Sequence, residues 1–153
     1  MSNWDCKKQV DVVILDFAKA YDTVPHRNLL NKLQFYGING NIHQWISSIL
    51  MNRDKCVIVD GQSSSSVHVQ SGVPQGTVLG PLLFLLHIND LPNEVRSTVR
   101  LFADDCLLYR VINSQQDQTI LQDDLTNLER LRSKWGMKFN AQKCSVWLAH
   151  VSH

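Results

Sequence analysis

Two adjacent aspartates lie inside a segment that is otherwise apolar and typical of β-structure. The segment RLFADDCLLYR covers residues 100–110, and its two halves, 98–103 and 106–112, have the composition of short strands. At an effective dielectric constant near 20, two like charges about 4 Å apart repel by roughly 4 kcal/mol. In one extended strand, Asp104 and Asp105 would also point to opposite faces. The pattern therefore predicts a hairpin that turns at the aspartates, with a divalent cation to compensate their charge.

A further carboxylate ends an apolar segment near the N-terminus. Residues 10–17, VDVVILDF, are rich in β-branched residues, as expected of a strand buried on both faces, and Asp16 lies at its end. If this strand neighbours the hairpin, Asp16, Asp104 and Asp105 meet at one edge of the sheet. Such a cluster favours Mg²⁺, which takes oxygen ligands at roughly 2.0–2.1 Å. Taken alone, the paired aspartates could equally be turn residues, and Asp16 a strand end or a helix cap.

Helical periodicity and turn residues predict the elements between these two sites. One helix is expected from Thr23 to Tyr36, with Asp22 or Thr23 as its cap, and a second over 41–52. The segments CVIVD and VHVQ flank GQSSSS, which indicates a hairpin with a polar tip. A constrained loop, GVPQGTVLGP at 72–81, then leads into the apolar helical run LLFLLHI.

The C-terminal part contains the most regular helical pattern. Residues 116–136 carry acidic side chains early and basic side chains late, which suits the helix dipole, and Gly136 ends the pattern. The apolar stripe consists of Ile120, Leu121, Leu125, Leu128, Leu131 and Trp135. A final strand, CSVWLAH, follows at 144–150. The order β-α-α-β-β-α-β-β-α-β predicts an α+β fold, an antiparallel sheet backed by helices.

Composition excludes several classes of protein. With 153 residues, 44% of them hydrophobic and 19% charged, the chain is expected to form a single globular domain. A net charge of +1 gives no overall basic field, so a nucleic-acid partner would have to be held locally. The four cysteines show no zinc or disulfide spacing, which favours a reducing intracellular compartment. The apolar run at 82–86 is far shorter than the roughly 18 residues of a membrane span, so no membrane partner is expected.

Four segments, in order, resemble successive motifs of the reverse transcriptases of non-LTR (LINE-like) retrotransposons. They are LDFAKAYDTVPH (15–26), SGVPQGTVLGPLLFLLHINDLP (71–92), LFADDCLLY (101–109) and GMKFNAQKC (136–144). The similarity runs from about Val10 to Leu148. It implies a reverse-transcriptase palm with RNA-directed DNA polymerase activity, in which a primer 3′-hydroxyl attacks the α-phosphate of a deoxynucleoside triphosphate and pyrophosphate leaves. RNA template, DNA primer and dNTP would be its partners.

The resemblance also implies roles for individual residues at the carboxylate edge. Asp16, Asp104 and Asp105 become the catalytic, metal-binding carboxylates, and the backbone carbonyl of Phe17 becomes a further ligand. Two Mg²⁺ ions would be held there, with Mn²⁺ as a substitute, in the clamp used for in-line nucleotidyl transfer. Cys106, directly after the aspartates, is expected to be a small packed residue.

Nucleotide and template contacts are implied for four more residues. Tyr21 matches the aromatic gate against the sugar, although a buried aromatic at the strand-to-helix turn would look the same. Gln75 and Gly76 match a nucleotide- and template-contacting loop, while a bare Gln-Gly pair signifies only a turn. Lys143 matches the lysine near the triphosphate; standing alone it would be a solvated lysine. Asp22 fits the family pattern but is expected to cap a helix.

The sequence also departs from a complete family member. Neither finger strands before VVILDF nor a primer-grip hairpin and thumb after the last strand are found. We therefore expect a palm fragment that forms a single domain, 1–153, with its core at about 10–149. We therefore expect the chain to bind Mg²⁺ weakly and not to carry out efficient templated DNA synthesis. One alternative is a non-catalytic, reverse-transcriptase-derived domain that binds RNA or protein; another is a palm-type cyclase, disfavoured by VPQGTVLGP. Action in the nucleus follows only from the family's use of chromosomal DNA as primer, and the cytoplasm is the alternative.

Overall fold

The computed structural model describes residues 8–151, which divide into two compact units. One unit consists of 8–18 together with 89–151, and the other consists of 19–88. The second unit is therefore inserted into the sequence of the first, between its first strand and the remainder. That the chain forms a single domain stays a prediction.

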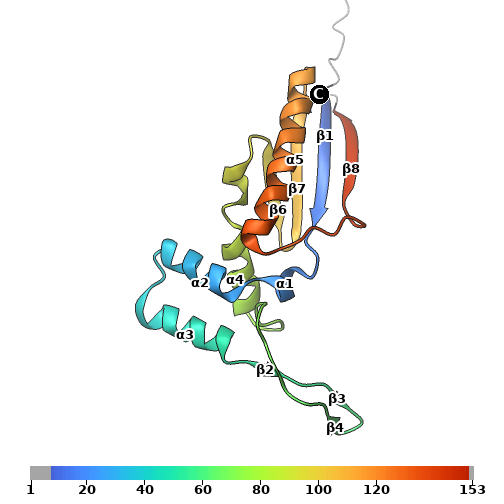
Figure 1. The fold of residues 1–153 in the computed structure, drawn as a ribbon. Helices are drawn as coiled ribbons and strands as arrows, with labels where there is room; N and C mark the ends of the chain where they lie inside the picture. Colours follow the sequence, from blue (N-terminus) through green and yellow to red (C-terminus); the bar gives the residue numbers. More distant parts are fainter. Residues whose placement is uncertain (1–7, 152–153) are drawn as a thin grey trace, which may run out of the picture. The chain divides into compact units, whose positions relative to one another are not determined.

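The first unit is built on a four-stranded antiparallel sheet in the order β6-β7-β1-β8. Its strands are β1 (Lys8–Asp16), β6 (Thr98–Phe102), β7 (Asp105–Ile112) and β8 (Ser145–Val151). β1 lies in the interior of the sheet and pairs with β7 on one side and with β8 on the other, so segments from opposite ends of the chain lie side by side (Figure 1). The predicted α+β fold with an antiparallel sheet is confirmed.

Helix α5 (Gln115–Trp135) lies against this sheet and supplies most of the helical side of its core (Figure 1). The predicted stripe is buried at Leu121, Leu128 and Leu131, and the helix ends at Gly136, whose φ of 69° is left-handed. The carboxylate of Asp124 is fully buried on the same side of the helix. Periodicity did not predict this residue, because an aspartate on an apolar stripe reads as a break in the pattern.

Buried Asp124 receives two backbone donors from the segment that precedes β6. Its Oδ1 accepts the amide of Arg96 at 3.0 Å, and its Oδ2 accepts the amide of Ser97 at 2.7 Å. The segment follows the short 3-10 helix η1 (Leu91–Glu94). The Asp124 carboxylate thus links α5 by hydrogen bonds to the residues directly before β6.

The second unit contains the remaining helices, which pack on one another through buried leucines. They are α1 (Ala20–Thr23), α2 (His26–Phe35), α3 (Gly40–Met51) and α4 (Leu79–Ile88). The single helix expected from Thr23 is wrong at its start, because Pro25 forces Val24 into an extended conformation and divides it. The prediction that Asp22 caps a helix is also wrong, since Asp22 lies within α1 and no side chain caps α2. Across residues 8–151, no helix is long and apolar enough to cross a membrane.

A β-ribbon connects α3 to the GVPQG loop. Its outer pair is β2 (Asp54–Lys55) with β5 (Val67–His68), and its inner pair is β3 (Ile58–Val59) with β4 (Gln62–Ser63). The expected hairpin is present, but its turn falls at Asp60–Gly61 instead of the serine run. Both residues have positive φ, as a type I′ turn requires, and Asp-Gly is a preferred pair for that turn.

Candidate active site

The structure places two of the three predicted carboxylates opposite each other. Asp16, the last residue of β1, and Asp105, the first residue of β7, are register partners in the antiparallel ladder. Directly opposed residues share a face of the sheet, with Cβ atoms about 4.5–5.5 Å apart. Asp104 precedes Asp105 in the turn that joins β6 to β7. The three residues therefore lie at one edge of the sheet.

The turn beside the carboxylates has an unusual backbone. It contains only Ala103 and Asp104, because Phe102 and Asp105 are its closing pair, so each strand differs from its predicted boundary by one residue. Ala103 has a φ of 51°, a left-handed conformation that a side chain with a Cβ rarely adopts. A two-residue hairpin with positive φ at its first position normally carries glycine there. The turn that presents Asp104 is therefore strained.

Replacing Ala103 with glycine is expected to raise the free energy of unfolding by about 1 kcal/mol, because glycine adopts positive φ without steric cost. Urea unfolding of the wild type and variant measures the change. Ala141→Gly is the matched control, since Ala141 is exposed and has no positive φ, and it is expected to lose stability. Equal losses in both variants would show that Ala103 is not strained.

The fourth motif is bound to the end of β1. Phe17 and Phe139 form an isolated antiparallel bridge, and their rings stack with centroids 4.8 Å apart. On either side of the bridge, the amide of Ala18 donates to the carbonyl of Lys138 at 2.7 Å, and the amide of Asn140 donates to the carbonyl of Asp16 at 2.8 Å. Segment 138–140 thus lies directly beside the residue that carries the first carboxylate.

This docking brings Lys143 to Asp16. The chain turns at Asn140, whose carbonyl accepts the amides of Lys143 and Cys144 at 3.0 and 3.1 Å. Lys143 Nζ lies 3.6 Å from Asp16 Oδ1; the lysine side chain is 66% exposed, while that of Asp16 is 13% exposed. The cation offsets part of the repulsion between opposed carboxylates, and its other donors face solvent. Lys143 is the one predicted nucleotide contact that lies in the first unit.

The donor set fits a hard divalent cation. Carboxylate oxygens are the ligands that Mg²⁺ prefers, and a metal site here requires Asp104 to join the opposed pair Asp16 and Asp105. Across residues 8–151, no three Asp, Glu, His or Cys side chains already stand close enough together to hold an ion. Cys106 is fully buried, as expected of a small packed residue, and burial raises the pKa of its thiol to about 12. That these aspartates and the Phe17 carbonyl bind metal stays a prediction.

In the second unit, the GVPQG loop is fixed to the segment around α1. The amide of Gly72 donates to the carbonyl of Val24 at 2.8 Å, and the amide of Val73 donates to the carbonyl of Tyr21 at 2.7 Å. A Cβ on Gly72 would lie 2.8 Å from the backbone of both Tyr21 and Asp22, so only glycine permits this approach. The first two motifs therefore fold together.

Asp22 links the predicted nucleotide contacts of this unit. Gln75 Nε2 donates to Asp22 Oδ1 at 2.7 Å, and the neighbouring Tyr21 packs its ring on Phe84 with centroids 4.8 Å apart. Gly76 has a φ of 75°, and nothing lies within 4 Å of where its Cβ would stand. Sequence reasoning assigned Asp22 to a helix cap and missed this role; its place directly after Tyr21 in the first motif was the available signal.

Comparison with known proteins assigns the family. The model of the family "Reverse transcriptase (RNA-dependent DNA polymerase)" matches residues 2–152. The Pol polyprotein of a type-1 R2 retrotransposable element from Popillia japonica is 28% identical over 95% of this chain and 25% of its own length. The RNA-directed DNA polymerase of the mobile element jockey from Drosophila funebris is 31% identical over 91% of this chain and 16% of its own.

Solved structures show the same fold at low identity. Telomerase from Candida tropicalis, in complex with a fragment of telomeric RNA, superposes with a TM-score of 0.72 at 14% identity, over 94% of this chain and 26% of its own. The chain spans about a quarter or less of the length of the relatives named above. Polymerases of this family generally use divalent metal ions. The chain belongs to the reverse transcriptase (RNA-dependent DNA polymerase) family, and its relatives are those of non-LTR retrotransposons, as the four motifs predict.

Proposed function

We propose that this chain supplies the nucleotidyl-transfer residues of an RNA-directed DNA polymerase, acting on an RNA template, a DNA primer and dNTP. The observation that supports this most is the opposition of Asp16 and Asp105 at the ends of neighbouring strands, with Asp104 in the adjoining turn. Such opposition of like charges destabilises a sheet unless something compensates it. Two Mg²⁺ ions, or Mn²⁺ in their place, provide that compensation.

The chemistry requires positioning and charge neutralisation more than covalent participation. The ions would be held by Asp16, Asp104, Asp105 and the carbonyl of Phe17. When bound, they would supply charge neutralisation at the phosphate oxygens for in-line attack of the primer 3′-hydroxyl on the α-phosphate. Lys143, 3.6 Å from Asp16, provides a proton for the departing pyrophosphate.

The second unit is assigned to the nucleotide and the template. Tyr21 packs against the sugar of the incoming dNTP, and its contact with Phe84 fixes the ring. Gln75 and Gly76 contact the nucleotide and template; the open space beside Gly76 allows a ligand to approach its backbone closely. Action in the nucleus belongs to this proposal, since chromosomal DNA would supply the primer.

A non-catalytic role in binding RNA or protein is the second candidate. The family match over 2–152 and the presence of all three aspartates favour the polymerase assignment. The same match disfavours a cyclase. Metal binding discriminates between the two remaining candidates, because a domain kept only for binding has no use for converging carboxylates.

Replacing Asp104 with alanine is expected to weaken binding of Mg²⁺ or Mn²⁺ with dNTP by at least tenfold. Removing even an outer-shell partner of a metal site costs about 10–100-fold in affinity, and a direct ligand costs no less. Isothermal titration calorimetry of the wild type and Asp104→Ala measures the loss. Primer extension on an RNA template, assayed next, is expected to be weak in the wild type and absent in the variant.

Asp123→Ala is the matched control, since it removes an exposed carboxylate from α5, away from the aspartate edge, and is expected to bind as the wild type does. Equal affinity in wild type and Asp104→Ala, or no binding in either, would mean that the carboxylates do not hold metal. A binding domain derived from a reverse transcriptase would then be the better assignment.

A further inference from the structure

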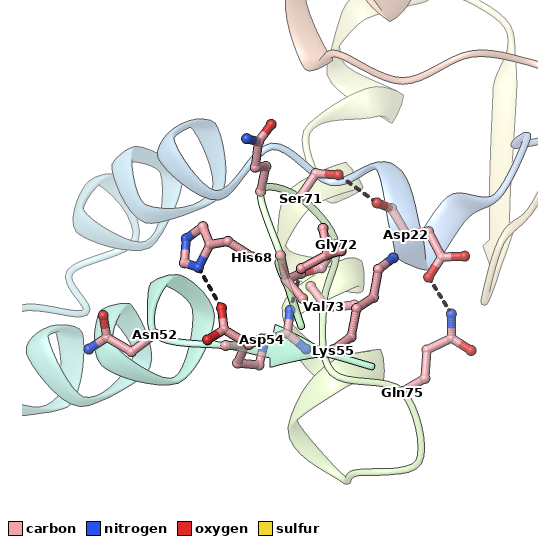
Figure 2. A pocket seen from close by; sticks show the side chains of 13 residues that line it. Asp22, Asn52, Asp54, Lys55, His68, Ser71, Gly72, Val73 and Gln75 are labelled. Carbon is pink, nitrogen blue, oxygen red and sulfur yellow. Dashed lines mark hydrogen bonds and ion pairs between the residues drawn. The ribbon is translucent and has the colours of Figure 1, made fainter. Parts of the chain in front are cut away.

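A pocket of about 780 Å³ lies in the second unit, at the base of the β-ribbon. It is bounded by α1, by the start of β2, by β5 and by loop 69–73, and Figure 2 shows the side chains around it. The charged side chains that line it are those of Asp22, Arg53, Asp54 and Lys55, and His68, Gly72 and Gln75 also belong to the lining. The pocket therefore adjoins Gln75, although none of the four motifs contains the ribbon.

Charges on the ribbon are divided between its two faces. Asp54 and His68 are register partners, and His68 Nδ1 lies 3.0 Å from Asp54 Oδ1. Because side chains alternate along a strand, Lys55 belongs to the other face of β2, and Arg53 lies just before the strand. Figure 2 shows the Asp54–His68 pair on one side of the ribbon and Lys55 on the other. Asp54 also lines the pocket, but its carboxylate is engaged by His68.

Arg53 has hydrogen-bonding capacity that the protein does not use. Its Nη2 donates to the carbonyl of Gly72 at 2.8 Å, while its Nε is buried and has no acceptor among residues 8–151. A guanidinium carries five N–H donors in a planar fork that matches phosphate oxygens. The loop therefore holds Arg53 in one position; its Nε is closed off from solvent, so an outside acceptor must reach the Nη donors.

His26 contacts the same carbonyl as Arg53. Its Nε2 lies 2.8 Å from the Gly72 oxygen. Burial is the main cause that lowers the pKa of His26; the hydrogen bond to Gly72 opposes it, and the charges of Arg53 and His68 add to the lowering. Asp22 and Asp54 are the acids that line the pocket; Gln75 donates to Asp22 Oδ1, and His68 Nδ1 lies 3.0 Å from Asp54 Oδ1. An anion is favoured at the end of the pocket formed by Arg53 and Lys55.

We propose that Arg53 and Lys55 bind one backbone phosphate of a single-stranded nucleic acid that continues past Gln75. The inference rests on the proposed function, because it makes the ribbon part of the path of the template. Arg–phosphate contacts are charge-assisted and can be bidentate, and Lys55 adds a point charge. Asp22 repels a second phosphate, so the site takes a single one. The strand is recognised by its backbone and not by its bases.

Lys55→Gln is expected to weaken binding of a labelled single-stranded oligouridine of about ten nucleotides by roughly 5–10-fold at 50 mM salt. The slope of log affinity against log salt is expected to fall by about 0.7, which is one phosphate contact on a single strand. Fluorescence anisotropy in EDTA measures both quantities without metal. Arg27→Gln is the control: Arg27 is exposed on α2, does not line the pocket, and its replacement makes the same change in charge.

Equal effects of Lys55→Gln and Arg27→Gln would overturn the proposal, because they would indicate diffuse attraction. Failure of the wild type to bind RNA would overturn it as well. A third result would also contradict the proposal: dNTP competes with RNA for the site, and Lys55→Gln weakens binding of dNTP as much as binding of RNA. The site would then bind a phosphate of a nucleotide and not of a strand. A uniform methylphosphonate oligomer is expected not to bind. Because Lys55 is exposed, the melting temperature of Lys55→Gln is expected to match that of the wild type.

This test is independent of metal binding. Loss of RNA affinity in Lys55→Gln, together with equal metal affinity in wild type and Asp104→Ala, would support the phosphate site and reject the polymerase assignment. Normal RNA binding in Lys55→Gln, with metal binding lost in Asp104→Ala, would reject the phosphate site and support the polymerase assignment.

Discussion

Replacing Gly80 with alanine is expected to reduce the free energy of unfolding by about 3 kcal/mol, at the upper end of the usual range for overpacking. A Cβ at this position would stand 2.1 Å from the carbonyl oxygen of Pro74 and 3.0 Å from its carbon. Both are backbone atoms, so no side-chain rotation relieves the clash. Helix α4 cannot withdraw easily, since Leu83 and Phe84 are fully buried in its next turn. The GVPQG loop must therefore move.

That loop is also held by its own hydrogen bonds. Thr77 Oγ1 donates to the Pro74 carbonyl at 2.8 Å and accepts the amide of Gly80 at 3.1 Å. Moving the loop breaks this pair as well as relieving the clash. Alanine otherwise favours a helix over glycine by about 1 kcal/mol, so a stabilised variant would show that the close approach is absent.

Urea unfolding measures the effect, with Gly76→Ala as the control for glycine loss in the same loop. Gly76 has positive φ but open space around it, so its replacement is expected to cost only about 1 kcal/mol from backbone strain. The difference between the two variants isolates the contact with Pro74. A loss at Gly80 no larger than that at Gly76 would contradict the expectation.

The second large effect is expected at Asp124, where alanine is predicted to cost about 3 kcal/mol. The buried carboxylate accepts the amides of both Arg96 and Ser97, and its removal leaves two backbone donors unsatisfied at about 1–3 kcal/mol each, partly offset by entry of water. Amide hydrogen exchange at Arg96 and Ser97, together with chemical denaturation, measures the loss. Asp124→Asn, which keeps one acceptor oxygen, is expected to fall between wild type and alanine.

The neighbouring residue provides the control. Asp123 pairs with Arg96 at 2.9 Å, but its side chain is 57% exposed, and surface ion pairs contribute at most about 1 kcal/mol. Asp123→Ala is therefore expected to unfold nearly as the wild type does, with protection of the Arg96 amide retained. Similar destabilisation of the two variants would mean that burial of Asp124 is not what stabilises the segment.

Local sequence pattern predicted most of the fold because the elements concerned have strong local signals. The apolar strand ending in Asp16, the hairpin at Asp104–Asp105 and the long helix each combine periodicity with a clear boundary residue. Errors arose where two local signals compete. Pro25 divides a segment whose leucine spacing continues as one helix, and the Asp60–Gly61 pair takes the turn from the serine run.

The candidate site was predictable in its carboxylates and not in their surroundings. The strand end at Asp16 and the turn at Asp104–Asp105 each have a local signal, whereas the opposition of Asp16 and Asp105 depends on the pairing of β1 with β7, which the sequence left as a condition. Asp22 accepting from Gln75, and Arg53 donating to Gly72, join residues far apart in the sequence. Hydrogen bonds of this kind depend on how separate segments pack, which no spacing rule encodes.

The placement of β1 has a consequence for how the chain folds during synthesis. β1 is made before the other strands of its sheet: β7, which flanks it, follows roughly 90 residues later, and β8 later still. At about 5–20 residues per second, the strand waits for at least several seconds without either neighbour, with its apolar segment from Val12 to Leu15 uncovered. The insert 19–88 can form its own contacts in that interval. Assembly of the aspartate edge is therefore a late step, and chaperone capture during translation would act on β1.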